Sequence, residues 1–204
     1  MRVNIDLSAI QSKDTIIAAN NRQALAIKQS MALISGTSKM PKIFSYQSWI
    51  EKFWRSHHPT KEYRLLSQLE VRLMLKKFCK DSSVKNPDTF IDELIKCYRL
   101  SKSYGISVAE IKTFPSITSK LYVELIDRYE KFKEHNLCLD QTDIFNLSLG
   151  NFKSALDSKG QYYQYGFNEP TPEQRMLFKV LNCLPLSSRK IMNHSKNYSF
   201  TDQE

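Results

Sequence analysis

Three segments of the chain share one pattern, in which a short apolar run is followed at once by a helix that begins with a capping residue. They are DTIIAANNRQALAIKQSMALI from Asp14, KIFSYQSWIEKFW from Lys42 and YYQYGFNEPTPEQRMLFKVLN from Tyr162. Repetition of strand, tight turn and helix is typical of an α/β protein with a parallel sheet. In such sheets ligands bind beside the carboxyl ends of the strands. The pattern therefore predicts the fold class and the edge where a site would lie.

The three helices are expected to begin with capping boxes, in which the cap and the residue three places later exchange hydrogen bonds. The expected pairs are Asn20 with Gln23, Ser48 with Glu51, and Thr171 with Gln174. The strands before them are expected at Thr15–Ala19, at Ile43–Tyr46 and in a run that ends at Tyr165. The apolar run at 189–195 is interpreted as a further strand.

Between residues 60 and 157 the pattern changes to one helix after another. Apolar residues recur at helical spacing in four segments, LLSQLEVRLMLKKF, DTFIDELIKCYRLSKSYG, SKLYVELIDRYEKFKEH and TDIFNLSLGNFKSALD. Gly105 is placed to end the second of them. We therefore predict an α/β core formed by residues 1–59 and 158–204, with a large all-helical insertion over residues 60–157.

The composition fits a globular protein with a polyanionic partner or with no charged partner at all. Of the 204 residues, 41% are hydrophobic and 25% charged, and the formal net charge is +9. This excess is compatible with nucleic acid, but it is equally compatible with an ordinary basic protein. No apolar run is long enough to cross a bilayer, and the first residues lack the apolar core of a signal peptide. We expect a cytoplasmic protein without membrane contact.

The motifs of common enzymes are missing from the sequence. The nearest approach to a phosphate-binding loop, Gly36 to Lys39, has one glycine and follows a helix, so it is interpreted as a helix-ending turn. His57 and His58 are adjacent, which seldom suits one metal ion. Asp140 and Asp143 could hold a metal, although a helix N-terminus also favours such carboxylates. We predict no catalytic residues, no metal and no cofactor.

The four cysteines, at positions 79, 97, 138 and 183, form no CxxC pair. Zinc-ribbon and thioredoxin-like sites are therefore excluded. Free thiols buried in a reducing compartment are the expected state of all four.

Several of these segments together resemble the UvrD/Rep-like superfamily 1 helicases. The strand and helix from Asp14 resemble motif Ia, and Ser45 to Trp49 resemble the next DNA-facing motif. LDQTDIFNLSL resembles the segment that closes the helical 1B insertion, and the stretch from Tyr162 lies where the Walker B strand would be. The chain is most similar to AddB-type subunits and related DNA repair proteins of bacterial helicase–nucleases, which carry Gly-Phe-x-x-x-Thr-Pro-x-Gln in place of that acidic motif.

The resemblance implies a P-loop-NTPase-like, helicase 1A-like sheet that has degenerated. Gly166 and Phe167 occupy the places of the Asp that would hold Mg²⁺ and the Glu that would polarise water, and neither can do so. The chain before Asp14 is also too short for a Walker A strand and lysine. We therefore expect no ATP hydrolysis. Longer relatives continue into further domains and a nuclease, so the parent protein would be a helicase–nuclease subunit.

The resemblance further implies contacts with single-stranded DNA from two turns. Asn20, Asn21 and Arg22 would meet the backbone from the first turn, and Ser45, Gln47 and Ser48 from the second. Such contacts would be independent of base sequence and sensitive to salt. The alternative at Asn20 and Ser48 is a capping role alone. A protein-docking module without DNA contact, serving downstream domains or a partner subunit, stays open as a second function, and an unrelated enzyme as a third.

Overall fold

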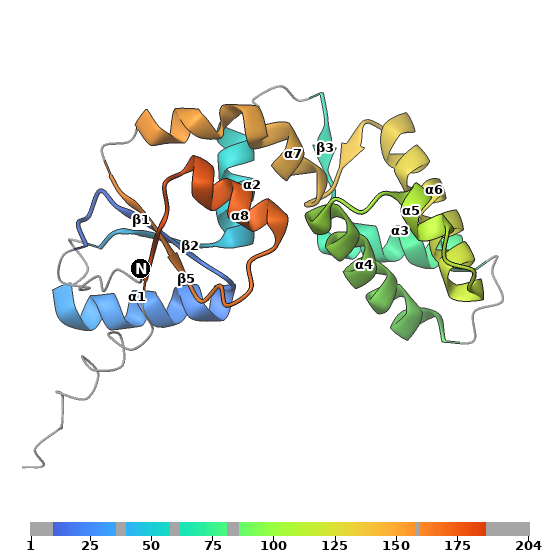
Figure 1. Ribbon diagram of the computed structural model, residues 1–204, viewed down its shortest axis with the longest axis horizontal. Helices are drawn as coiled ribbons and strands as arrows, with labels where there is room; N and C mark the ends of the chain where they lie inside the picture. The colour runs from blue at the N-terminus through green and yellow to red at the C-terminus, as the bar shows by residue number, and fades with distance from the viewer. Residues whose placement is uncertain (1–9, 36–39, 58–61, 81–85, 158–159, 187–204) are drawn as a thin grey trace, which may run out of the picture. The chain divides into compact units, whose positions relative to one another are not determined.

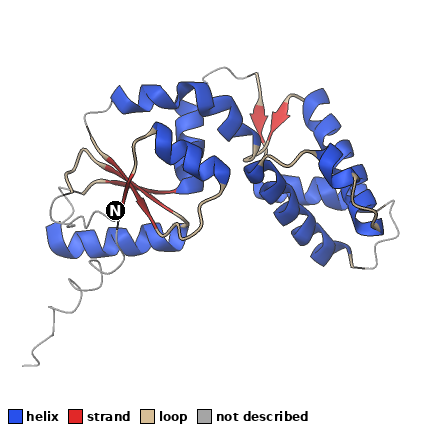
Figure 2. Ribbon diagram, viewed as in Figure 1, coloured by secondary structure: helices blue, strands red, loops and turns tan. Residues whose placement is uncertain are grey.

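The computed structural model describes residues 10–35, 40–57, 62–80, 86–157 and 160–186 (Figure 1). The chain divides into two compact units. The first contains the described residues of Met1–Phe53, Ser148–Pro170 and Arg175–Glu204, and the second those of Trp54–Leu147 and Thr171–Gln174. The fold class is α/β as predicted, with a small parallel sheet in the first unit and helices over most of the described chain (Figure 2).

The sheet of the first unit has four parallel strands in the order β2-β1-β5-β6. They are β1 (Thr15–Ala18), β2 (Lys42–Ser45), β5 (Tyr162–Tyr165) and β6 (Leu184–Pro185). Strands β1, β2 and β5 lie within one residue of their predicted positions, because each contains a short run of β-branched or aromatic residues. The strand expected at 189–195 lies outside the described residues.

Both faces of the sheet are covered, as parallel sheets require. On one face, Ile16 and Ala18 pack against Ala24, Ile27 and Met31 of α1 (Asn21–Ser35). On the other face, α2 (Tyr46–His57) places Trp49 edge-on to Tyr162 with ring centroids 6.1 Å apart. Figure 1 shows α1 and α2 on opposite sides of the sheet.

The amino end of the sheet is held by a buried carboxylate. Asp14 is 3% exposed, and its two oxygens accept the backbone N–H groups of Gln11 at 2.8 Å and Gln161 at 2.9 Å. Gly160 packs closely against the backbone of Lys13. A Cβ at position 160 would lie 2.0 Å from the Lys13 carbonyl oxygen. These contacts hold β1 and β5 in register. The two strands consequently end at the same level.

The second unit consists mainly of helices. They are α3 (Gln68–Cys79), α4 (Pro87–Tyr104), α5 (Val108–Lys112), α6 (Ile117–His135) and α7 (Asp143–Ser148). Ser67 begins α3 with a full capping box to Glu70, and Gly105 ends α4 in the left-handed conformation, as predicted. The core contains Leu75, Leu94, Leu125 and Tyr129. Three of the four predicted helical segments are therefore confirmed as α3, α4 and α6.

Two expectations for this region are wrong. The region is not all-helical, because β3 (Arg64–Leu65) and β4 (Cys138–Leu139) form a short parallel ladder. Leu137 has a φ of 50° in the turn after α6. The extended residues of β4 follow it directly. The helix expected over 142–157 divides into α7 and a 3₁₀ helix, Leu149–Asp157, where Gly150 and Asn151 have low helix propensity.

The expectation of four buried thiols is wrong at Cys97, which is exposed. The buried stripe of α4 runs through Ile91, Leu94, Tyr98 and Ser101, and Cys97 lies beside it. Cys79 and Cys138 are buried, and Cys183 is half-buried. Burial raises the pKa of the Cys183 thiol to about 12.

Candidate nucleic-acid interface

The candidate interface lies at the carboxyl edge of the sheet, where β1, β2 and β5 end level. Ala18 pairs with Ser45 on one side and with Tyr165 on the other. The Ala19 N–H donates to the Tyr165 carbonyl at 2.9 Å, which extends the ladder by one position. The residues that follow the three strands, Ala19, Tyr46 and Gly166, consequently lie at the same edge of the sheet. The edge was predicted from the strand–helix pattern alone.

Asn20 caps α1 as predicted, but only half of the expected capping box forms. Its Oδ1 accepts the Gln23 backbone N–H at 2.9 Å. In a full box the Gln23 side-chain oxygen would accept the Asn20 N–H. That oxygen instead is buried without a hydrogen-bond partner in the described chain. The Gln23 side chain lies over Gly166, where the missing Cβ leaves room for it.

The cap of α2 is Ser45, and the expectation of Ser48 with Glu51 is wrong. The Ser45 Oγ accepts the Ser48 backbone N–H at 3.3 Å and donates to the Ser48 Oγ at 2.9 Å. The helix begins directly after β2, at Tyr46. The hydroxyl of the last strand residue therefore caps the helix, and Ser48 becomes the third helical residue.

A chain of hydroxyl and amide groups joins the two turns. The Ser48 Oγ, held by Ser45, lies 3.5 Å from the Asn21 Oδ1 and donates a long hydrogen bond to it. Asn21 and Ser48 stand 27 positions apart in the sequence and come from different helices. The structure thus brings one residue from each predicted DNA-facing motif into direct contact.

The predicted interface residues differ in exposure. Ser45 is 4% exposed, and its hydroxyl is engaged by Ser48, so it positions its neighbours. The other five predicted residues are exposed: Asn20, Asn21, Arg22, Gln47 and Ser48. Arg22 forms no ion pair with any residue that the structure describes. Its charge adds to the positive end of the α1 dipole, and both favour an anion.

The third strand end is filled by packed side chains. Gly166 has a φ of 80°, and a Cβ there would lie 2.3–2.5 Å from the carboxamide of Gln23. The Phe167 ring packs edge-on to Phe178 with centroids 4.7 Å apart and to Tyr46 at 6.2 Å. An aspartate at 166 would meet backbone strain as well as the Gln23 side chain. Where the resemblance aligns an Asp for Mg²⁺ and a Glu for water, this chain has the Gln23 amide and an aromatic cluster.

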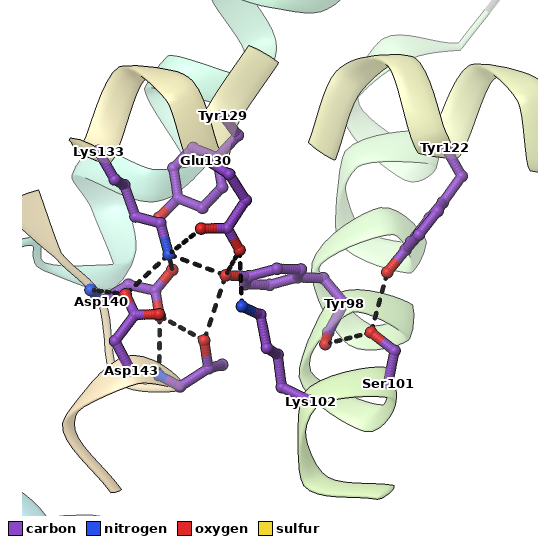
Figure 3. A network of polar contacts seen from close by, with 10 residues as sticks. Tyr98, Ser101, Lys102, Tyr122, Tyr129, Glu130, Lys133, Asp140 and Asp143 are labelled. Atoms are coloured by element: carbon purple, nitrogen blue, oxygen red, sulfur yellow. Dashed lines mark hydrogen bonds and ion pairs between the residues drawn. The ribbon is translucent and has the colours of Figure 1, made fainter. Parts of the chain in front are cut away.

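The second unit contains the carboxylates that were considered for a metal, Asp140 and Asp143. Lys133 lies between them, with its Nζ 3.1 Å from Asp140 and 2.7 Å from Asp143 (Figure 3). Glu130 lies 3.1 Å from the same ammonium group, which also donates to the Tyr98 hydroxyl at 2.9 Å. The Lys133 side chain is only 4% exposed. A lysine therefore occupies the centre of this carboxylate cluster and offsets part of its charge, which is typical of a structural network.

Hydrogen bonds from neighbouring side chains complete this Lys133 network. The Tyr129 hydroxyl donates to Asp140 at 2.8 Å, and the Thr142 hydroxyl donates to the other Asp140 oxygen at 2.6 Å. Lys102 lies 2.8 Å from Glu130 at the rim. Each buried charge consequently has several partners, which offsets the cost of removing it from water.

The charges of the network set its pKa values. Burial acts to lower the pKa of Lys133, but the charges of Asp140 and Asp143 outweigh it and raise that pKa. Burial acts to raise the pKa of Asp140, but Lys133 and the hydrogen bonds of Thr142 and Tyr129 lower it overall. The pKa of Asp143 is raised by burial and by the charge of Asp140. Lys133 and Asp140 therefore form the central charged pair.

Lys133 was missed at the sequence level although a signal was present. It follows Tyr129 by four positions and so continues the buried stripe of α6 through Tyr122, Leu125 and Tyr129. A lysine on such a stripe requires buried acids, and Glu130, Asp140 and Asp143 are all close enough along the chain to be candidates. Gln23 carried no comparable signal, because its contact with Gly166 depends on strand order.

No protein-family model matches the chain, and no curated protein matches it. Within the described residues, no helix combines the length and the apolar character needed to cross a membrane. The resemblance to helicases consequently depends on the motifs and on their placement at one sheet edge.

Proposed function

We propose that this chain is a helicase-like domain, related to the UvrD/Rep and AddB-type proteins, that binds the backbone of single-stranded DNA and does not hydrolyse ATP. In this proposal the first unit is a degenerate, P-loop-NTPase-like 1A sheet, and the helices between α2 and β5 are a 1B-like insertion. The observation that carries the proposal is the contact between Ser48 and Asn21 at 3.5 Å. It joins the two turns that resemble DNA-facing motifs.

The exposed groups at this edge suit a phosphate–sugar backbone. Asn21, Gln47 and Ser48 offer amide and hydroxyl groups, and Arg22 offers a guanidinium that can bind a phosphate in a bidentate manner. The N-termini of α1 and α2 add backbone N–H donors and a positive dipole end. None of these groups reads a base edge, so binding would be independent of sequence.

The absence of ATP hydrolysis follows from the third strand end. Gly166 and Phe167 supply no carboxylate for magnesium or for water, and Gln23 and Phe178 take up the space beside them. We expect a phosphate-release assay on the full chain to show no turnover with ATP, with or without single-stranded DNA. ATP-dependent turnover would contradict this part of the proposal.

Fluorescence anisotropy with a labelled single-stranded oligonucleotide tests DNA binding. Arg22→Ala should weaken binding about three- to tenfold at low salt and to the same degree for different sequences. Loss of one phosphate contact should also reduce the slope of log K against log salt by about 0.7. Lys28→Ala is the matched control, because it removes one exposed charge from the same helix beyond its first turn.

Equal effects of the two substitutions would contradict the assignment of this edge. No detectable binding at low salt would favour the alternative, a module that docks a partner subunit or downstream domains without DNA contact. Circular dichroism of each variant confirms that the fold is retained.

A further inference from the structure

A second surface of chemical interest lies on the second unit, between α3 and α4. The ion pairs Arg72–Asp92 and Lys76–Asp88 show that the two helices run antiparallel. Beside them is an open groove of about 510 Å³. It is lined by Gln68, Leu69, Arg72, Asp92, Ile95, Lys96, Arg99 and Leu100. The groove shares no residue with the proposed DNA interface.

The groove has apolar walls whose side chains are exposed to solvent. Leu69 is 64% exposed, and Leu100 on the facing helix is 47% exposed. Leu73, one turn after Leu69, is 56% exposed, which continues the apolar surface along α3. Leucines that are exposed in a row on two adjacent helices are typical of a helix-binding groove.

The charges around these leucines are mostly positive. Arg72, Lys96 and Arg99 line the groove against one acid, Asp92, so the lining carries a net charge of +2. Arg72 is held by Asp92, and Lys96 lies 3.7 Å from Glu93. Arg99 forms no ion pair among the residues that the structure describes. It is therefore the cation best placed to meet an incoming acid.

We propose that this groove binds an acidic amphipathic helix of a partner protein. The apolar side chains of that helix would lie against Leu69 and Leu100, and a carboxylate would meet Arg99. Nucleic acid fits less well, because its charged backbone has no apolar groups to cover the leucines. The surface is independent of the proposed DNA site.

The test uses three synthetic peptides of about 18 residues, a length that supports helix formation. The first carries leucines at positions i, i+4 and i+7 with glutamates on the flanking positions. In the second peptide lysines replace the glutamates, and in the third alanines replace the leucines. Binding of each labelled peptide to the full chain is measured by fluorescence anisotropy. We expect only the acidic leucine peptide to bind with an affinity in the micromolar range or somewhat weaker.

Two variants locate the binding. Arg99→Glu should weaken binding of the acidic peptide about tenfold, and Leu69→Ser about fivefold. Lys120→Glu is the matched control, since it reverses an exposed charge on α6 of the same unit, and it should change binding by less than about twofold. Thermal unfolding checks that each variant folds.

Three results would overturn the proposal: no binding of the acidic peptide, equal binding of the lysine peptide, or equal losses in Arg99→Glu and Lys120→Glu. Competition by single-stranded DNA that disappears in Arg99→Glu would show a nucleic-acid groove instead. If DNA binding depends on Arg22 and not on Arg99, the DNA site and the groove are separate surfaces. Either proposal can then fail without the other.

Discussion

The sheet edge of the first unit and the Lys133 network of the second unit both concentrate polar side chains, but they use them differently. At the edge, Asn20 and Ser45 satisfy backbone groups at helix starts, and Asn21, Arg22 and Ser48 remain exposed. In the network, charged groups satisfy one another away from water. The comparison teaches that polar side chains exposed to water remain available to a ligand, whereas buried polar side chains that pair with one another stabilise the fold.

The difference has an energetic cause. A buried charge that loses its partner retains the cost of its desolvation, whereas an exposed charge is simply hydrated again. Changes in the network should therefore alter stability strongly. Changes at the exposed part of the edge should alter binding and leave stability almost unchanged.

The largest effect is expected for Lys133→Met, which removes the buried ammonium and leaves three carboxylates without it. The free energy of unfolding should fall by about 3–5 kcal/mol. Lys131→Met on the same helix is the control, because Lys131 is exposed and, among the residues that the structure describes, has an ion pair with Asp127 alone. Its effect should stay below about 0.5 kcal/mol. Urea denaturation measures both, and similar losses would contradict a buried, structural role for Lys133.

Gly166→Ala tests how closely the third strand end is filled. The positive φ and the contact with Gln23 should together cost about 1–3 kcal/mol. Gly150→Ala, where a Cβ would meet nothing within 4 Å, should change stability by less than about 0.5 kcal/mol. Adding Gln23→Ala to Gly166→Ala should recover part of the loss in thermal unfolding. No recovery would mean that Gln23 does not cover Gly166.

Tyr129→Phe tests the network through its pH dependence. Burial and the charge of Asp140 raise the pKa of Tyr129 above its ordinary value of 10.0. The folded phenol therefore stays protonated while the unfolded phenol ionises, so this stabilisation is complete below pH 10 and is lost as pH rises above it.

Unfolding free energies measured across this alkaline window should fall less steeply in Tyr129→Phe than in the unmodified chain. The difference in slope should be about 1.4 kcal/mol per pH unit. Parallel pH profiles would show that Tyr129 titrates alike in the folded and unfolded states.

The smallest effect distinguishes the two serines of the second turn. Ser45→Ala removes the cap of α2 and should cost about 1 kcal/mol. Ser48→Ala, at the third helical position, should cost less than about 0.5 kcal/mol. Thermal unfolding of both variants measures the difference. A larger loss of stability in Ser48→Ala than in Ser45→Ala would show that Ser48 is the cap of α2.

The parts of the fold that could be predicted from the sequence are those set by local chemistry. Strands β1, β2 and β5 were visible as short apolar runs, and the cap at Thr171 forms the expected box with Gln174 at 3.0 Å and 3.3 Å. The cap of α2 was misplaced because Ser45 and Ser48 are both acceptable caps. Only the length of β2 decides between them.

The parts that could not be predicted depend on partners distant in the chain. The β3–β4 ladder involves two residues on each side, which is too little for a propensity signal. The half-formed box at Asn20 depends on Gly166 lying beneath Gln23, which requires β5 to pair with β1. The exposure of Cys97 depends on which face of α4 meets the core.

By itself, the sequence determined the α/β class, the three strand–helix units and the lack of a carboxylate at Gly166 and Phe167, because hydrophobic period, caps and side-chain chemistry are local properties. Only the tertiary structure decided that Asn21 meets Ser48, that Gln23 covers Gly166 and that Lys133 pairs with Asp140 and Asp143. These contacts arise when parallel pairing and helix packing bring distant residues together, and no local pattern encodes which partners will meet.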